Sequence, residues 1–419
     1  MSKVAGVKGM SDLLPGGDVE AFQYLETRAR EVLRRTGYGE VRTPVLEETA
    51  LFVRGVGEGT DIVGKEMYTF EDKGGRSLSL RPEATASLVR AYIEHSISNQ
   101  EPLTRWFCFG PMFRYERMKT GRYRQFYQLD VEAFGVKGPA QDAEVIEVAL
   151  EILRAVDLKG VKLELNSIGD KECRPAYQQQ LVSYFTGFKD QLCAECQARL
   201  ERNPLRILDC KNEKCREIAR GAPKLLDHLC QPCREHFAEV QRLLALVGVD
   251  FTINPWIVRG LDYYVRTAFE LIADDPVLGT ASAVGGGGRY DGLVQSLGGP
   301  DVPGVGFALG ADRLKLLMQG RAFAQAPDLF VASVDDKSFD AAFALASKLR
   351  KDGLWVETDT RGGSLKSQMK RADKSGARFA LVVGEREVAE QAGELKPLRG
   401  GEPRRVPFAE LPVILRPSP

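Results

Sequence analysis

Apolar residues recur at helical spacing near the start of the chain, and a turn signal follows them. The recurring residues are Phe22, Leu25, Ala29, Val32 and Leu33. Gly37 then supplies a stop, and residues 38–46 have an extended pattern around Pro44, so helix, turn and strand are predicted in that order. A second helix is predicted over residues 145–153, before a strand over residues 161–165.

Two stretches rich in aromatic and apolar residues lie on either side of a charged loop that contains glycine. They cover Arg105–Phe113 and Phe126–Phe134. Strands of this length joined by one loop are typical of an antiparallel hairpin. We therefore expect a long hairpin in this part of the chain.

The character of the sequence changes in residues 166–254. Cysteine pairs and charged helical stretches replace the aromatic pattern of the hairpin, and strand-like sequence resumes at Trp256. We interpret this segment as an inserted domain. It interrupts a unit made of residues 1–165 and 255–320.

A short stretch with glycine, alanine and proline near residues 319–327 precedes the last part of the chain, residues 327–419. Strands and helices alternate beyond this stretch. The expected strands are 329–334, 354–358 and 379–383, and the expected helices are 339–349 and 365–372, ending near Gly353 and Gly376. Strands separated by helices of this length predict a small, mainly parallel α/β domain with right-handed crossovers.

The composition indicates a globular protein of more than one domain, with 419 residues, 43% of them hydrophobic and 28% charged. No stretch offers the roughly 20 apolar residues of a membrane span, and residues 1–12 lack an apolar core of secretory length, so a cytoplasmic protein is expected. Lys plus Arg equals Asp plus Glu at 58 each, so a nucleic acid would have to bind to local basic patches. The histidines, His95, His228 and His236, lie far along the chain from the segments described next, so a histidine base is not expected.

Residues 113–126 concentrate positive charge on the loop of the predicted hairpin. The cations are Arg114, Arg117, Lys119, Arg122 and Arg124. No acid follows Glu116 within the segment. Because two apolar strands support this loop, it would stabilise a bound phosphate. The alternative is a solvated basic loop without a ligand.

A second candidate for phosphate binding is residues 304–314, in which small residues allow close approach of the backbone. A helix that begins near Gly310 would carry Arg313 in its first turn. There the guanidinium would face a phosphate or an adenine ring. A tight packing joint between a strand and a helix would explain the same pattern.

Two other glycine-containing stretches do not support nucleotide-binding motifs. In residues 59–66, Glu66 stands where a phosphate-binding loop needs Ser or Thr to hold magnesium, and its carboxylate would repel the phosphates. The run of glycines at 285–288 leads into Arg289-Tyr290-Asp291 and not into a helix of the dinucleotide-binding type.

Three segments, in this order along the chain, resemble the signature motifs of class II aminoacyl-tRNA ligases. They are Pro44 after the first helix, Phe113-Arg114-Tyr115-Glu116 with its loop, and Gly306 to Arg313. Two further segments resemble the histidine-specific signatures of histidyl-tRNA ligases: Arg259-Gly260-Leu261-Asp262-Tyr263-Tyr264 and Gly287-Gly288-Arg289-Tyr290-Asp291. With Leu80 to Thr85 and the last α/β domain, the resemblance covers nearly the whole chain.

The resemblance implies an α+β fold. It comprises an antiparallel-sheet catalytic domain of the class II type, a mainly helical insertion that approaches the acceptor stem, and a C-terminal α/β anticodon-binding domain. It also implies a homodimer that uses ATP with Mg²⁺ to activate L-histidine as histidyl-adenylate. Histidine would then be transferred to the 3′ end of tRNA(His).

The same resemblance implies roles for individual residues. For ATP they are Arg114, Glu116, Arg122, Phe126 and Arg313, with the adenine stacked on Phe126. For histidine they are Glu83, Ala84, Thr85, Arg114, Gln128, Glu132, Arg259, Tyr263, Tyr264 and Tyr290. Arg114 and Arg259 would be the catalytic residues, on either side of the α-phosphate. Glu132 and Tyr264 would hydrogen-bond the two imidazole nitrogens, although each tyrosine would also suit a core position with a satisfied hydroxyl.

Some positions depart from the family pattern. Ala84 stands where the family commonly has Gly, and Asp312 where class II enzymes often have Glu. The larger departure is three cysteine pairs in the inserted segment, Cys193-x2-Cys196, Cys210-x4-Cys215 and Cys230-x2-Cys233. Because a reducing cytoplasm disfavours disulfides and CxxC pairs suit tetrahedral zinc, we expect one structural zinc on four of these six cysteines. Unligated buried thiols are the alternative.

Two other functions remain open at this point. One is a catalytically silent paralogue that regulates histidine biosynthesis by binding a phosphoribosyltransferase. Such proteins usually lack the C-terminal domain and the Arg259 signature, and this chain has both. The other is a ligase for a different amino acid, such as proline or threonine.

Overall fold

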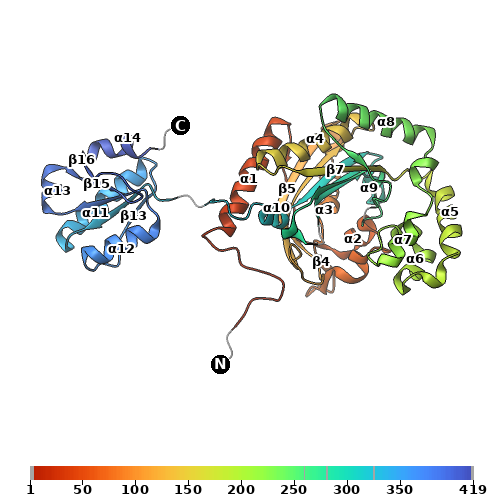
Figure 1. Cartoon of the computed structure of the whole chain (residues 1–419), viewed down its shortest axis with the longest axis horizontal. Coiled ribbons are helices and arrows are strands. Elements are labelled where there is room, and N and C mark those ends of the chain that lie inside the picture. Colours follow the sequence, from red (N-terminus) through yellow and green to blue (C-terminus); the bar gives the residue numbers. More distant parts are fainter. Residues whose placement is uncertain (1–3, 259, 280–281, 324–325, 417–419) are drawn as a thin grey trace. The chain divides into compact units, whose positions relative to one another are not determined.

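The computed structural model describes residues 4–258, 260–279, 282–323 and 326–416. The chain folds into two compact units, Met1–Ala322 and Phe323–Pro419 (Figure 1). None of the described helices is long and apolar enough to span a membrane. The two units are described separately below.

The first unit is built on an eight-stranded sheet in the order β1-β5-β6-β11-β10-β9-β7-β8. The strands are β1 Gly39–Glu40, β5 Thr104–Phe113, β6 Gln125–Phe134, β7 Val161–Ser167, β8 Thr252–Ile253, β9 Val265–Ala273, β10 Ala283–Arg289 and β11 Gly304–Gly310. Neighbours from β5 to β7 in this order are antiparallel, and only the short edge strands β1 and β8 pair in parallel. The hairpin predicted from the two aromatic stretches is β5 and β6, paired along their full length.

Helices pack against this sheet through the apolar faces that their sequences predict. The main ones in this unit outside the inserted segment are α1 Asp18–Arg35, α2 Thr49–Val56, α3 Thr85–Glu94, α4 Pro139–Ala155 and α10 Ala311–Leu317. In α1 all five residues of the predicted stripe are buried, and the backbone reverses at Gly37 with φ +79°. A small antiparallel sheet lies beside α2 and α3, in the order β2-β4-β3: Leu46–Glu48, Ser77–Leu80 and Tyr68–Glu71.

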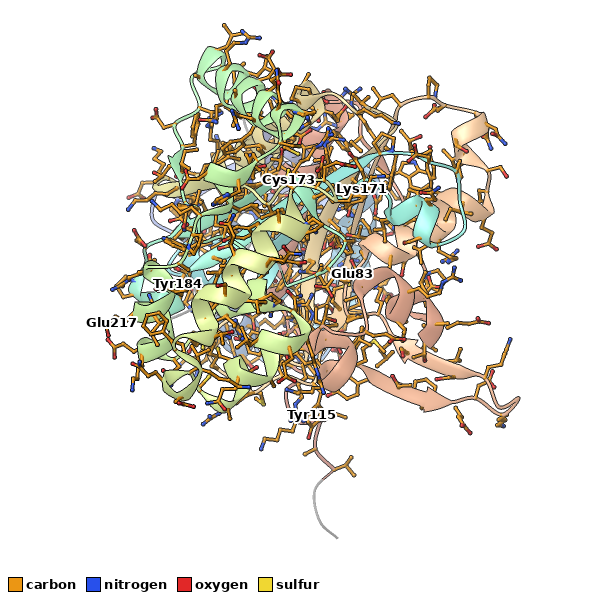
Figure 2. The ribbon with its side chains drawn as sticks, turned by 90° about the vertical axis from the view of Figure 1, so that its right-hand side faces the viewer. Glu83, Tyr115, Lys171, Cys173, Tyr184 and Glu217 are labelled. Atoms are coloured by element: carbon orange, nitrogen blue, oxygen red, sulfur yellow. The ribbon has the colours of Figure 1, made fainter. Side chains whose placement is uncertain are left out.

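The inserted segment is helical among its described residues. Its helices are α5 Arg174–Thr186, α6 Ala194–Arg202, α7 Glu213–Arg220 and α8 Gln231–Leu246. Figure 2 shows α5, α6 and α7 gathered together, with the exposed Glu217 on their outer side. Tyr184 of α5 donates a hydrogen bond to the Ile218 carbonyl of α7 at 2.9 Å. Their core is continuous with that of the sheet, because Leu181 and Leu200 belong to the same hydrophobic cluster as Phe134.

The return from the inserted segment to the sheet differs from our expectation. No strand runs from Trp256 into residues 261–264 among the described residues, and β9 begins only at Val265. Asn254 explains the difference: its side chain accepts a hydrogen bond from the Trp256 N–H at 3.0 Å, and its carbonyl accepts one from Ile257. With Pro255 between them, these local bonds form a turn in place of a ladder.

The second unit contains a five-stranded sheet in the order β13-β12-β14-β15-β16. The strands are β12 Leu329–Ser333, β13 Val356–Thr358, β14 Phe379–Val383, β15 Ala392–Pro397 and β16 Arg404–Pro407, and the helices are α11 Asp336–Lys351, α12 Leu365–Ser375, α13 Glu385–Glu390 and α14 Leu411–Leu415. The three predicted strands are present and parallel. The prediction of a mainly parallel domain was incomplete, because β15 and β16 add two antiparallel ladders to the sheet.

Candidate active site

A cavity of about 340 Å³ opens on the face of the large sheet. Among the residues expected in the site, its lining contains Glu83, Thr85, Arg114, Glu116, Arg122, Phe126, Gln128, Glu132, Tyr263, Tyr264 and Arg313. Ala84 is fully buried in a neighbouring apolar cluster and does not line the cavity. Tyr290 is buried directly behind it. Arg259 lies outside the described residues.

Strand β6 supplies one wall of the cavity through alternate residues. Phe126, Gln128, Asp130 and Glu132 all line it. Since successive side chains of a strand point to opposite faces, this spacing places all four on one face. Asp130 was not among the expected residues, although the same alternation makes it a neighbour of Gln128 and Glu132.

One end of the cavity holds three buried carboxylates, those of Glu83, Asp130 and Glu132, each at most 3% exposed. Burial raises the pKa of Asp130 to about 8 and that of Glu132 to about 8. Burial also raises the pKa of Glu83. A cationic ligand that enters this end would restore the ionised carboxylates, so the arrangement suits an amino group or a protonatable ring.

Glu132 is held by two hydroxyl groups. Thr85 Oγ1 donates to one carboxylate oxygen at 2.6 Å, and the Tyr290 hydroxyl donates to the other. A Cβ at Gly306, on the neighbouring strand β11, would lie 1.7 Å from Glu132 Oε2, so only glycine leaves room for this carboxylate. The sequence did not indicate this contact between Tyr290 and Glu132.

Glu83 has a structural partner as well as a position in the cavity. Its carboxylate accepts the backbone N–H groups of Thr85 and Ala86, both at 2.9 Å. These are free N–H groups at the start of α3, so Glu83 caps this helix and fixes Thr85 beside Glu132.

Two acceptors in the cavity have no protein partner among the described residues. Gln128 Oε1 and Asp130 Oδ2 are buried side-chain atoms without a hydrogen bond. An unpaired buried acceptor costs about 1 to 3 kcal/mol, so both atoms would gain from a ligand that donates hydrogen bonds.

Another part of the cavity lining is basic. Arg122 Nη1 donates to Glu116 at 2.8 Å, and Arg114 Nε donates to the Pro82 carbonyl at 2.8 Å. Arg313 occupies the first turn of α10, as predicted, and donates to the Gly121 carbonyl at 3.2 Å. Burial, together with the nearby Arg122, lowers the pKa of Arg313. An anion in this part would therefore relieve repulsion among three guanidinium groups.

The Phe126 ring has a neighbour that the sequence did not indicate. The Arg114 guanidinium lies 5.2 Å from the centre of this ring, within the range of a cation–π contact. Arg114 is thereby aligned by an aromatic face and by the Pro82 carbonyl together.

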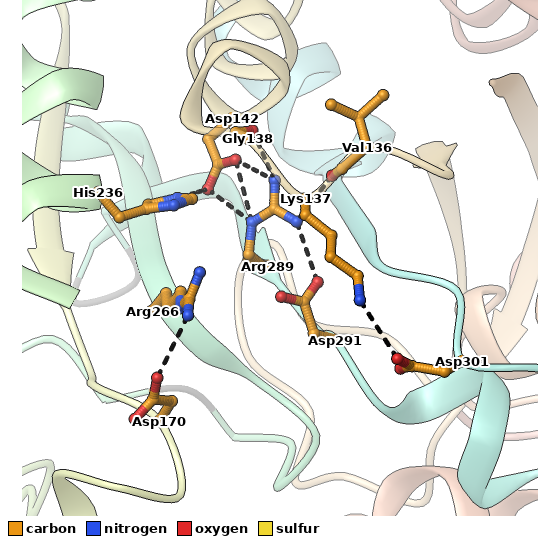
Figure 3. A network of polar contacts seen from close by, with 10 residues as sticks. All are labelled: Val136, Lys137, Gly138, Asp142, Asp170, His236, Arg266, Arg289, Asp291 and Asp301. Atoms are coloured by element: carbon orange, nitrogen blue, oxygen red, sulfur yellow. Dashed lines mark hydrogen bonds and ion pairs between the residues drawn. The ribbon is translucent and has the colours of Figure 1, made fainter. Parts of the chain in front are cut away.

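Behind the cavity, a buried network anchors the end of β10 (Figure 3). Arg289 is fully buried and forms an ion pair with Asp142, which also contacts His236 Nε2 at 3.1 Å. Arg289 also donates to the carbonyls of Val136 and Gly138 at 3.0 and 3.1 Å. Because Tyr290 follows Arg289 directly, this network fixes the residue that holds Glu132.

The cysteines of the inserted segment form two groups that could each hold a metal ion. The groups are Cys193, Cys196, Cys210 and Cys215, and Asp170, Cys173, Cys230 and Cys233, with the ligand atoms of each group within 4.8 Å of one another. The cysteine spacing predicted a single zinc on four of six cysteines, and Cys230 and Cys233 were two of these six. The fold brings two further ligands, Asp170 and Cys173, to Cys230 and Cys233.

The mainly antiparallel sheet, with buried carboxylates and arginines in one cavity on its face, agrees with the class II catalytic domain that the resemblance implies. The family model "Histidyl-tRNA synthetase" matches residues 9–314, and the model "Anticodon binding domain" matches residues 328–416. The chain belongs to the histidyl-tRNA synthetase family.

Individual relatives are similar over almost the whole chain. The histidine–tRNA ligase of Anaeromyxobacter sp. (strain K) is 51% identical over 412 residues, 98% of each chain. The histidine–tRNA ligase of Desulforamulus reducens is 49% identical over 413 residues, again 98% of each chain. Among solved structures, apo histidyl-tRNA synthetase of S. aureus is 36% identical with a TM-score of 0.83, covering 99% of this chain and 100% of that one.

Proposed function

We propose that the chain is a histidine–tRNA ligase, which activates L-histidine with ATP to histidyl-adenylate and pyrophosphate and then transfers histidine to the 3′ end of tRNA(His). The observation that supports this most directly is the polarity of the cavity. Three buried carboxylates line one part of it, and Arg122 and Arg313 line another. Arg114 interacts electrostatically with Glu83, Asp130 and Arg313. A substrate with a cationic amino group and an imidazole, joined to a polyphosphate, complements both parts.

In this proposal each part of the cavity has a separate task. Glu83, Gln128 and Asp130 receive the α-amino group, and Glu132 receives an imidazole nitrogen. The ring of Tyr263 lies 4.6 Å from that of Tyr264, so these two rings form the apolar wall around the imidazole, and the buried Tyr290 ring supports Tyr263 at 5.6 Å. The roles of Ala84 and Arg259 rest on the family resemblance.

The activation step needs positioning more than proton transfer. The substrate carboxylate is already ionised, attacks the α-phosphorus, and displaces pyrophosphate, which enters the reaction as part of ATP with its Mg²⁺. Arg114 neutralises charge at the α-phosphate, and Arg122 and Arg313 hold the outer phosphates. Because their contacts with Glu116, Pro82 and Gly121 fix them beforehand, little reorganisation is needed in the transition state.

The first cysteine group suits a structural zinc. Cys193 Sγ and Cys210 Sγ lie 3.9 Å apart, close to the roughly 3.8 Å that tetrahedral Zn–S bonds of about 2.3 Å produce. Backbone N–H groups of Cys193 and Asn212 point at Cys215 Sγ and Cys210 Sγ, at 3.2 and 3.4 Å. Such N–H donors stabilise thiolates, so we propose that these four cysteines hold a zinc ion.

The proposed division of labour follows the chain. Residues 1–165 and 255–320 carry the chemistry, residues 166–254 approach the acceptor stem, and residues 327–419 bind the anticodon. We further propose a cytoplasmic homodimer.

Histidine-dependent exchange of pyrophosphate into ATP tests the proposal when it is compared across the twenty amino acids. Exchange with histidine alone, followed by charging of tRNA(His), is the expected result. Exchange with another amino acid would reassign the pocket. Absence of exchange with all twenty would favour the regulatory paralogue.

A further inference from the structure

A second group of metal ligands lies where the inserted segment leaves and rejoins the sheet. Asp170 and Cys173 follow β7, whereas Cys230 and Cys233 lie at the start of α8. All four ligand atoms lie within 4.8 Å of one another. We propose that Asp170, Cys173, Cys230 and Cys233 bind a second zinc ion, separate from the one at Cys193.

The four ligand atoms lie close enough to converge on one ion. Asp170 Oδ1 lies 3.5 Å from Cys173 Sγ and 3.9 Å from Cys230 Sγ, and the two sulfurs lie 3.1 Å apart. The sulfurs are thus too far apart for the roughly 2.05 Å bond of a disulfide. Tetrahedral Zn–S bonds of about 2.3 Å place two sulfurs roughly 3.8 Å apart, so binding of zinc would move these two sulfurs apart by about 0.7 Å. Cysteine thiolates and aspartate carboxylates are both zinc ligands, and four such ligands complete a tetrahedral site.

The two groups repeat one local design. Cys193 precedes α6 and Cys230 precedes α8, each as the N-cap residue, and the second cysteine of each pair lies in the first helical turn. The Cys230 N–H donates to Cys173 Sγ at 3.1 Å, much as the Cys193 N–H donates to Cys215 Sγ. Helix N-termini and N–H donors stabilise thiolate charge, so both groups are prepared for a cation.

The surroundings of the second group also fit a bound ion. Arg266 Nη2 lies 3.4 Å from Asp170 Oδ2, the oxygen opposite the cysteines (Figure 3). Arg266 has a left-handed backbone conformation, with φ +52°, at a bulge between β9 and β10. A non-glycine residue keeps such a strained conformation only where neighbouring contacts enforce it. Gly169 has φ +60°, and a Cβ there would lie 3.1 Å from Cys173 Cβ. A carboxylate oriented by a second partner is typical of metal ligands.

The second group is linked to the wall of the substrate cavity. Arg174, the first residue of α5 after Cys173, donates to the Tyr264 carbonyl and to the Ile168 carbonyl. The Arg266 N–H donates to the Gly169 carbonyl at 2.7 Å. An ion at Cys173 would therefore position Tyr264 through α5, and Figure 2 shows Cys173 near the strands and away from Tyr184.

The metal content of the full-length protein tests the proposal without relying on its activity. Protein purified under reducing conditions should contain about two zinc ions per chain by elemental analysis. Cys196→Ser and Cys233→Ser should each lose about one, and the double variant both. One zinc that is lost in Cys196→Ser but retained in Cys233→Ser would overturn the second site, as would a Cys173–Cys230 disulfide found by mass spectrometry of alkylated protein.

A milder pair of variants covers the case in which Cys233→Ser fails to fold. Asp170→Asn removes the charged ligand, and Glu172→Gln makes the same change at an exposed neighbour outside the group. In competition with a chelator, Asp170→Asn should release one zinc at least about tenfold more readily than Glu172→Gln. Equal release would overturn the proposal.

The link to the cavity has its own readout, which rests on the proposed function. Asp170→Asn should raise the KM for histidine in pyrophosphate exchange and leave the KM for ATP near its original value. Glu172→Gln should change neither. Zinc loss without any change in histidine KM would overturn the link to Tyr264, whereas the metal count would still decide the site.

Discussion

Replacing Glu132 with glutamine tests how the cavity recognises histidine. The wild-type carboxylate accepts hydrogen bonds from both Thr85 and Tyr290 and is 1% exposed. A glutamine has one oxygen, so its amide nitrogen must face a second hydroxyl or the imidazole. One hydrogen bond to a charged group would be lost.

Hydrogen bonds to charged groups contribute about 1.5 to 3 kcal/mol, which corresponds to a roughly 10- to 150-fold fall in kcat/KM for histidine. Burial raises the pKa of Glu132 to about 8, so the carboxylate is ionised increasingly as the pH rises through this value. Glutamine does not titrate. The ratio of wild-type to variant kcat/KM should therefore grow with pH, and titration of the substrate cancels in this ratio.

Pyrophosphate exchange measured against histidine and ATP separately provides the assay. The histidine KM should rise while the ATP KM stays near its original value. Glu144→Gln is the matched control, because Glu144 pairs with Arg105 outside the cavity. An equal rise in both KM values for Glu132→Gln would mean that the imidazole does not bind at this residue.

Three further predictions concern other parts of the chain. A chain ending at Ala322 keeps the whole cavity. If it folds, this chain should retain pyrophosphate exchange but lose most tRNA charging. Equal loss of both activities would contradict the proposed division of labour between the two units. The resemblance implies that Arg259 contacts the α-phosphate, and loss of an electrostatic transition-state contact lowers kcat. Arg259→Lys should therefore lower kcat for activation by about 10²-fold and leave both KM values near normal. A rise in histidine KM at constant kcat would instead make Arg259 a binding residue. Because burial raises the pKa of Asp130 from 3.8 to about 8, the folded protein without substrate holds an extra proton between these values. This residue therefore makes stability fall as the pH rises from about 4 to about 8. Asp130→Asn should therefore lose less stability than the wild type between pH 5 and 8 in denaturant unfolding, and parallel curves would refute the assignment.

The periodic features of the chain were determined by the sequence itself. The five apolar residues of α1 are all buried, and β5 and β6 form the predicted hairpin. Both follow from the fixed repeats of 3.6 residues in a helix and two in a strand, which depend on the local chain alone. The alternation of Gln128, Asp130 and Glu132 also lay within the sequence, although the middle residue was overlooked.

Only the tertiary structure decided which distant residues meet. Tyr290 holds Glu132, because β10 and β11 bring Tyr290 behind the cavity and Gly306 leaves space for the carboxylate. Asp170 and Cys173 join Cys230 and Cys233 across a separation of about 60 residues. His236, remote in sequence, meets Arg289 through Asp142. Spacing along the chain carries no information on such contacts, since they depend on how whole elements pack, and that is decided by the sum of many weak apolar contacts.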